Sequence, residues 1–283
     1  MRLRTFVSDH INIRYIRLAA LALLVVAFAG SNAFALDPMG PTTAGLRQGE
    51  SVIGIDYIHS NMNLKLTHGK WSETFNGTFN GAGEAVSFDL DDFKTNKIYA
   101  NFEYGIWDGC ELYLRLGGVS TEFGDSIWEA NEKFDSNTNF TFCLGSRATF
   151  YEIGELQIGR LIQISWANID GDLKVPLPEY PQPDDVDIEL LEVQIAIGPT
   201  YTAPNGTSIY GGPFFHFVDG NLEDKFTDIS GISSKYSWDI EETSIFGGYL
   251  GAQLCFSENT FLNLEYQHTG GADAFGLSFL YRF

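Results

Sequence analysis

The sequence predicts an all-β protein, a closed antiparallel transmembrane β-barrel of ten strands. Three observations predict it. Apolar and polar residues alternate along ten segments, and most connections between the segments alternate between short turns and long loops. No apolar run after Leu36 is long enough for a spanning helix. Ten is an even number, as in bacterial single-chain barrels. Eight strands with an external hairpin, or twelve strands with paired loop segments, are alternatives that the pattern leaves open.

The first 35 residues have the pattern of a secretion signal. Arg2, Arg4 and Arg14 precede the apolar run LAALALLVVAFAG, which is too short for a comfortable membrane span. The triplet AFA that ends at Ala35 suits signal peptidase, so the mature chain is expected to begin at Leu36. We therefore expect a signal peptide over residues 1–35, a periplasmic lead-in over residues 36–50 and the barrel over residues 51–283.

The chain is strongly acidic. The leader holds four of the 17 basic and one of the 37 acidic residues, so the remainder has 13 and 36 and a net charge of about −23. This charge argues against nucleic acid as a partner. Cys110, Cys143 and Cys255 show no metal-binding spacing, and their odd number excludes a full disulfide framework. Buried free thiols are expected, with one bridge left open.

Each of the ten segments has one apolar and one polar face. In the first, Ile53, Ile55 and Tyr57 alternate with Gly54 and Asp56. The segments are residues 51–66, 97–106, 110–118, 140–150, 155–166, 191–201, 208–218, 244–256, 260–268 and 274–283.

Two positions break the regular pattern of the segments. Arg160 falls on an apolar face, which predicts a local bulge, and Pro213 removes a ladder donor, which predicts a kink or bulge.

The connections between segments predict how the sheet closes. Four of them are the short turns WDG, YEIG, APNG and SEN, and the other joins are mostly long. The N- and C-termini of the barrel then both lie on the short-turn side, which is typical of barrels in outer membranes. An open edge in hydrocarbon would leave backbone groups unpaired, so the last strand is expected to pair with the first. The long join after the first strand is expected to rise as a hairpin that turns at NGAG, residues 80–83.

The last strand carries the most specific motif. Its alternate positions are apolar to the final residue: Phe275, Leu277, Phe279, Tyr281 and Phe283. With the leader and the strand pattern, the chain resembles a small bacterial outer-membrane β-barrel protein over Ser51 to Phe283. The resemblance implies that this tail is the assembly signal read by the barrel-assembly machinery, after periplasmic chaperones. It also implies a location in the bacterial outer membrane, in contact with its lipid and lipopolysaccharide.

If the apolar faces meet lipid, the polar faces line the interior. The expected interior charge network is Asp56, Glu103, Glu111, Arg115, Arg147, Glu192, Glu265 and Arg282. We expect these charges to be paired with one another, for example Arg115 with Glu103, because an unpaired buried charge is costly. Ten strands leave at most a narrow path, and the inward carboxylates would make such a path prefer cations.

Two features of the loops could contact other molecules. Asp185, Asp187 and Glu189 share a parity just above the apolar band, where Ca²⁺ or Mg²⁺ could bridge them to lipopolysaccharide phosphate. A solvated acidic rim is the alternative. Trp71, Phe75 and Phe79 in the expected hairpin could bind a partner, although packing within the hairpin is favoured.

Catalysis is the weaker interpretation of this sequence. Ten-stranded barrels include the omptin proteases, which use Asp and His at the rim, and here His216 precedes Asp219 while His268 also lies near a rim. Neither a G-x-S-x-G nor an H-E-x-x-H motif is present. We therefore expect a non-enzymatic barrel without a cofactor, either a narrow cation-preferring pore or a structural or surface-interaction protein. An omptin-like protease or a lipid A-modifying hydrolase is the alternative, and the sequence specifies neither a ligand nor an oligomeric state.

Overall fold

The computed structural model describes residues 36–124, 133–174, 184–228 and 230–283. The chain divides into two units, residues 1–32 and residues 33–283, and the account below concerns the second. The predicted signal peptide therefore lies outside the described residues. No helix among the described residues is long and apolar enough to span a membrane.

Thirteen antiparallel strands form one sheet. They are β1 (Ser51–Phe75), β2 (Thr78–Glu84), β3 (Phe88–Trp107), β4 (Cys110–Gly124), β5 (Lys133–Ser136), β6 (Asn139–Ile153), β7 (Leu156–Lys174), β8 (Asp184–Thr202), β9 (Ser208–Thr227), β10 (Ile232–Glu242), β11 (Phe246–Ser257), β12 (Thr260–Thr269) and β13 (Ala272–Arg282).

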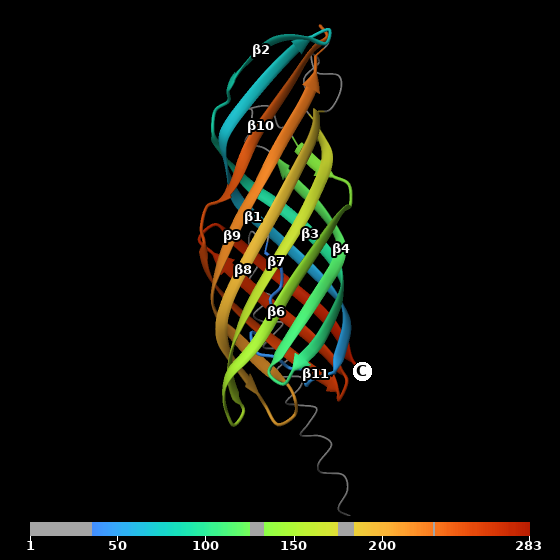
Figure 1. The fold of residues 1–283 in the computed structure, drawn as a ribbon, viewed down its shortest axis with the longest axis vertical. Coiled ribbons are helices and arrows are strands. Elements are labelled where there is room, and N and C mark those ends of the chain that lie inside the picture. The colour runs from blue at the N-terminus through green and yellow to red at the C-terminus, as the bar shows by residue number, and fades with distance from the viewer. Residues whose placement is uncertain (1–35, 125–132, 175–183, 229) are drawn as a thin grey trace, which may run out of the picture. The chain divides into compact units, whose positions relative to one another are not determined.

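Ten of these strands close into a ring, as the alternation predicted. The order around the ring is β1, β3, β4, β6, β7, β8, β9, β11, β12 and β13, and β13 returns to β1 from Val52↔Arg282 to Met62↔Ala272 (Figure 1). Away from the short turns, β5 pairs with both β4 and β7 and β10 pairs with both β1 and β9, so these two strands continue the wall, whereas β2 pairs with β1. We call the two ends of the ring the turn end and the loop end.

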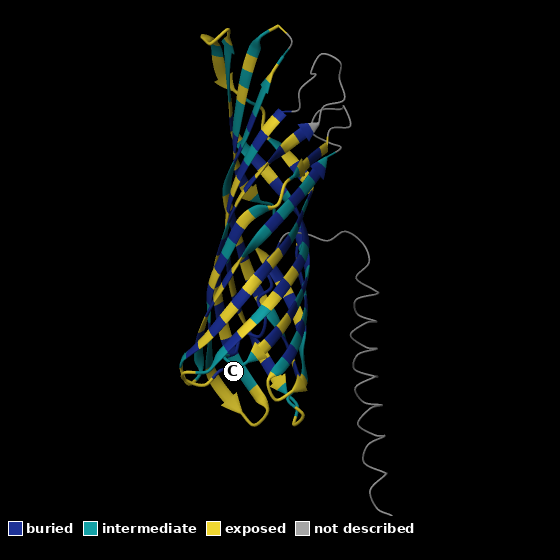
Figure 2. Cartoon of the chain, turned by 90° about the vertical axis from the view of Figure 1, so that its right-hand side faces the viewer, coloured by how far each residue is buried: buried dark blue, intermediate teal, exposed yellow. Residues whose placement is uncertain are grey.

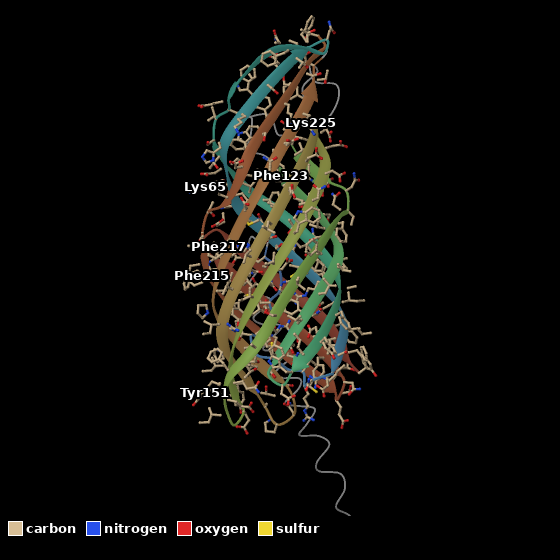
Figure 3. The ribbon with its side chains drawn as sticks, in the orientation of Figure 1. Lys65, Phe123, Tyr151, Phe215, Phe217 and Lys225 are labelled. Carbon is tan, nitrogen blue, oxygen red and sulfur yellow. The ribbon has the colours of Figure 1, made fainter. Side chains whose placement is uncertain are left out.

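The side chains alternate across the wall. Ile55 is 62% exposed on the outside, whereas Asp56 beside it is fully buried inside. The same alternation of buried and exposed positions marks the strands in Figure 2. Phe215 and Phe217 project outward from β9 in Figure 3 and are about half exposed. A wall with apolar residues outside and polar residues inside is the architecture of outer-membrane β-barrels.

The two predicted irregularities differ from expectation. Arg160 does lie on the outward face, but β7 pairs with β8 without a shift, and the register shift lies opposite, between Thr149 and Tyr151 of β6. Around Pro213 the β8–β9 ladder is interrupted, yet the register is the same before and after the interruption. On the other side of β9, the β9–β11 ladder continues through Gly248↔Pro213. Pro213 therefore removes ladder bonds without adding a residue to the strand.

The predicted hairpin is present, but it turns earlier than expected. β1 continues to Phe75, and the turn is Asn76–Gly77, where both residues have the positive φ that a type I′ turn requires. The NGAG segment instead lies within β2, where the ring of Trp71 covers Gly81 and Gly83. A Cβ on Gly83 would meet that ring at 2.8 Å, so glycine is what lets the indole pack on the strand.

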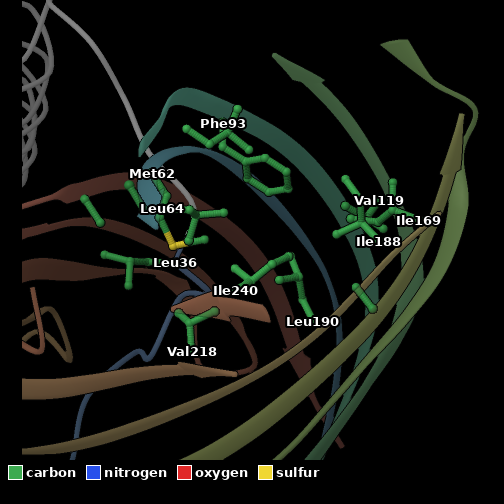
Figure 4. Close-up of a cluster of buried hydrophobic side chains, with 14 of the residues drawn as sticks. Leu36, Met62, Leu64, Phe93, Val119, Ile169, Ile188, Leu190, Val218 and Ile240 are labelled. Carbon is green, nitrogen blue, oxygen red and sulfur yellow. The ribbon is translucent and has the colours of Figure 1, made fainter. Parts of the chain in front are cut away.

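The interior has two layers. Toward the loop end, buried apolar side chains fill it, several of which Figure 4 shows, and the ring of Phe123 stacks between those of Phe93 and Phe134. Polar and charged side chains occupy the interior toward the turn end. The apolar layer includes Met62, Leu64, Leu66, Leu90, Val119, Ile169, Leu173, Val186, Ile188, Leu190, Val218, Leu222, Trp238 and Ile240.

Candidate functional site: the occupied barrel interior

The lead-in expected outside the barrel over residues 36–50 lies largely within it. We call Leu36 to Leu46 the plug segment. At the turn end its residue Leu46 packs with Val52, Phe261 and Leu280. At its other end Leu36 is fully buried and belongs to the apolar layer, close to Met62 and Leu64 (Figure 4). Of the expected lead-in, only Gly45 and residues 47–49 are exposed.

The plug segment cannot satisfy its own backbone. Its sequence, LDPMGPTTAGL, contains two prolines, which lack an N–H donor, and the described backbone hydrogen bonds include none between two of its residues. Gly40 has a φ of 72°, a conformation that favours glycine. The buried N–H and C=O groups of the plug segment must therefore find partners on the surrounding wall.

Two wall carboxylates hold the N–H groups of the plug segment. The two oxygens of Glu265 accept hydrogen bonds from the backbone N–H groups of Met39 at 2.8 Å and Gly40 at 2.7 Å. One oxygen of Glu111 accepts from Gly45 at 3.0 Å and Leu46 at 3.1 Å. Hydrogen bonds to a charged acceptor are about twice as strong as neutral ones.

Wall cations and amides hold the C=O groups. The guanidinium of Arg115 donates to the carbonyl of Pro38 at 2.6 Å, which is short for a protein hydrogen bond and marks a close contact. The remaining bonds of this kind are Arg147 to Met39 at 3.1 Å, Gln163 to Asp37 at 3.2 Å, Gln267 to Asp37 at 2.7 Å and Arg282 to Gly45 at 3.2 Å.

Among the described residues, the side chain of Asp37 forms the one ion pair between the plug segment and the wall. Its Oδ1 lies 3.0 Å from Nζ of Lys97 and accepts a hydrogen bond from the hydroxyl of Tyr99 at 3.2 Å. Lys97 also contacts Glu192 at 2.9 Å, whose other oxygen lies 3.0 Å from Nε2 of His216. Sequence reasoning missed Lys97, although it shares the inward parity of Tyr99, Asn101 and Glu103.

The predicted interior charges lie together, although not with every expected partner. Nε of Arg115 is 2.7 Å from Oδ2 of Asp56, not paired with Glu103 as expected, because Arg115 on β4 reaches past β3 to β1. Arg147 pairs with Glu103 at 3.3 Å and with Glu111 at 2.9 Å. The structure buries seven of the eight predicted residues; Arg282 is half-buried, with its guanidinium over the ring of Phe261. Five of the eight groups bond directly to the plug segment: Glu111, Arg115, Arg147, Glu265 and Arg282.

The plug segment borders one open hollow of about 660 Å³ at the turn end, which is lined in part by Ala44, Leu46 and Tyr151. Two small cavities also border the segment. One of about 70 Å³ lies at the turn end and is lined in part by Thr43, Glu111 and Arg282. Another of about 10 Å³ lies beside Gly40 and is lined in part by Asn101 and Tyr210. The second has about the volume of a single water.

The acidic rim residues face outward from β8, because Val186, Ile188 and Leu190 of the alternate set are buried. Asp185 is exposed, Asp187 pairs with Lys225 at 2.7 Å, and Glu189 accepts a hydrogen bond from the indole N–H of Trp166 at 2.9 Å. Among the described residues no group of three or more His, Cys, Asp or Glu is arranged to hold a metal ion. Divalent bridging to lipopolysaccharide stays a prediction.

The histidines do not form the arrangement considered for catalysis. His216 is fully buried in the interior against Glu192, whereas Asp219 is exposed on the outward face. His268 pairs with Asp273 at the surface. All three cysteines are free, but only Cys143 is buried, so the expectation of buried thiols holds for one of them.

The predicted assembly signal lies on the outward face of β13. Phe279 and Phe283 are 53% and 63% exposed, and the backbone N–H of Phe283 donates to the carbonyl of Ser51 at 3.0 Å. The last residue thus pairs with the first of β1. Recognition of this tail by the assembly machinery stays a prediction.

Comparison with solved structures finds distant likenesses to bacterial outer-membrane barrels. Outer membrane protein OprG from Pseudomonas aeruginosa is 11% identical, with 84% of this chain and 98% of that one covered and a TM-score of 0.44. The Ralstonia pickettii toluene transporter TbuX is 10% identical, with 89% and 95% covered and a TM-score of 0.41. Outer membrane protease OmpT from Escherichia coli is 11% identical, with 81% and 97% covered and a TM-score of 0.41.

No protein-family model matches the chain, and no curated protein matches it significantly. The structural likenesses are too distant to indicate a function. A function for this chain therefore has to be argued from its own residues.

Proposed function

We propose that this protein is an integral outer-membrane barrel whose interior is closed by its own N-terminal segment, and that it serves as a scaffold for β-structure at the cell surface. The observation that carries this proposal is the occupied interior. The plug segment fills the polar layer, and the apolar side chains above it are almost entirely buried. A constitutively open pore needs a continuous aqueous path, and neither layer favours one.

The outside of the ring supports the membrane location. Exposed apolar side chains such as Ile98, Leu114, Ile164 and Leu250 surround it, and in water this surface would be an aggregation hazard. In a membrane the same side chains would face hydrocarbon, while the closed ring leaves no unpaired strand edge there.

The lengths of the strands support a role beyond the membrane. A tilted strand crosses a bilayer in about 9–11 residues, whereas β1 has 25 residues and β3 and β9 have 20 each. The loop-end parts of these strands carry charged outward residues, including Lys65 and Lys225, both labelled in Figure 3. Such a surface suits water, so these parts would stand above the lipid.

The test is the conductance of the refolded protein in a planar bilayer. We expect no steady openings, with a refolded open porin as the positive control in the same lipid. The heat-dependent gel mobility of the same sample shows that the silent protein is folded. Steady, cation-selective openings would contradict the closed scaffold and would favour a narrow pore lined by the inward carboxylates.

A further inference from the structure

We infer that the polar interior is a peptide-binding site, with the plug segment as its resident ligand and peptides that carry an acidic residue three positions before a glycine as the class it accepts. This inference rests on the proposed function in one respect, that the segment occupies the interior. It adds that the segment is held as a ligand is held and that another peptide of the same chemistry can replace it.

The wall recognises the main chain of the plug segment. Nine backbone atoms of the plug segment are bonded to wall side chains: the N–H groups of Met39, Gly40, Ala44, Gly45 and Leu46, and the C=O groups of Asp37, Pro38, Met39 and Gly45. Three of its side chains bond to the wall, those of Asp37, Thr42 and Thr43. Recognition through the main chain tolerates most changes of side chain.

The plug segment is separable from the sheet. It pairs with no strand of the sheet and is joined to β1 only through residues 47–50, of which residues 47–49 are exposed. A ligand tethered by so short a link has a high effective concentration, so it occupies its site even when its intrinsic affinity is modest. Cutting the link removes that advantage and makes the site available to a peptide in solution.

The interior cations and the fit around Gly40 define the ligand. The described interior contains three buried cations, Lys97, Arg115 and Arg147, beside the half-buried Arg282, and Lys97 is the one that binds a carboxylate of the segment. At the position three residues after Asp37, a Cβ on Gly40 would lie 2.9 Å from Nη2 of Arg147. The prolines at positions 38 and 41 bring no N–H group that would need a partner. The accepted peptide therefore has an acidic residue followed three positions later by glycine.

The experiment cuts the link after folding. Trypsin is expected to cleave after Arg47, which is exposed, and mass spectrometry identifies the cut. The cut barrel is then titrated with the synthetic peptide LDPMGPTTAGL, labelled at the end that corresponds to Leu46 because this end lies at the turn end. We expect saturable binding by fluorescence anisotropy to the cut barrel and none to the uncut barrel.

The affinities of peptide variants show which positions of the peptide the site recognises. Asp37→Asn and Gly40→Ala in the peptide should each weaken binding at least tenfold, and Lys97→Met in the barrel should do the same to the unchanged peptide. A peptide that keeps positions 36–41 and 46 and has alanine elsewhere should bind within about tenfold of the original, because it keeps the buried apolar side chains and loses only the two threonine hydroxyls. Equal binding of the Asp37→Asn peptide, or loss of binding with the alanine peptide, would overturn the assignment.

A second preparation distinguishes slow release of the resident plug segment from a lack of affinity of the site for the added peptide. A chain that lacks residues 36–46 offers the empty site directly, and the cut barrel serves where that chain does not refold. If the cut barrel releases its segment and the site then binds no peptide, the peptide-binding inference fails. That result leaves the closed state of the uncut barrel untouched, since the latter is judged by its conductance alone.

Discussion

At the scale of single residues, Gly40 shows how closely the plug segment fits its wall. Gly40 and Gly49 both have positive φ, but a Cβ on Gly49 would have nothing within 4 Å. Alanine at either position costs about 1 kcal/mol for its conformation. Gly40→Ala must also displace the ion-paired Arg147, at a further cost of about 1–3 kcal/mol. Urea unfolding in lipid vesicles should therefore show the larger loss for Gly40→Ala, and equal losses would mean that the contact with Arg147 is absent.

Asp184 gives a prediction about pH. It is buried at the start of β8, beyond the outward band of apolar side chains that would face lipid. Burial raises the pKa of its carboxyl to about 6. Below about pH 4 the group is protonated in both states, so it costs nothing, and stability falls as pH rises from there through 6. The shift corresponds to at most about 3 kcal/mol, and we expect about 1–2 kcal/mol because the position borders solvent.

Asp184→Asn should therefore stabilise the protein at pH 8 and leave it unchanged at pH 3.5, measured by urea unfolding at both values. Asp185→Asn is the matched control, because Asp185 is exposed on the other face of the same strand. A gain from Asp184→Asn that is the same at both pH values would refute the assignment to ionisation.

Parity along a strand predicted which charges point inward but not their partners. Asp56, Glu103, Arg115 and Arg147 could be assigned to the interior because side chains alternate strictly across a strand. The pairing of Arg115 with Asp56 depends on how far a guanidinium reaches around the inner wall, and on the carbonyl of Pro38 beside it. Neither can be read from alternation.

At the scale of elements, the ring strands were predictable because each has an apolar face toward the outside. The plug segment was missed because its sequence, LDPMGPTTAGL, shows no alternation of apolar and polar residues. Its position is instead stabilised by wall residues that are distant in sequence. A signal was present in the large set of inward charged residues, which a ten-stranded interior must pair or cover. Most of the apolar layer was missed because it lies in the longer strand ends beyond the ten segments, although Met62, Leu64 and Leu66 in the first segment share the inward parity of Asp56.

The tail of β13 gives a prediction about assembly. Phe283 ends an outward apolar row and pairs with Ser51 where the ring closes. Deleting Phe283, or adding a charged residue after it, should reduce the amount of folded protein in cells more than the yield of refolding in detergent. Equal effects in the two settings would mean that the residue contributes packing alone and no recognition signal.

At the scale of the whole molecule, the account describes a barrel that is closed at two levels by different chemistry. Toward the turn end, wall carboxylates and guanidinium groups bind the main chain of the plug segment. Toward the loop end, apolar side chains pack across the interior. The sequence predicted the ring and its closure, whereas what fills the ring follows from contacts between residues more than 60 positions apart.

The most direct test of this account is a cross-link between the plug segment and the wall. The hydroxyls of Thr43 and Thr200 are 2.9 Å apart. With the three free cysteines replaced by alanine, Thr43→Cys and Thr200→Cys should form a disulfide on mild oxidation, whereas Thr43→Cys with Ser278→Cys should not. The account predicts the cross-link in the folded protein and its absence in urea. A folded protein without the cross-link, whose cysteine at position 43 reacts freely with a membrane-impermeant thiol reagent, would contradict it.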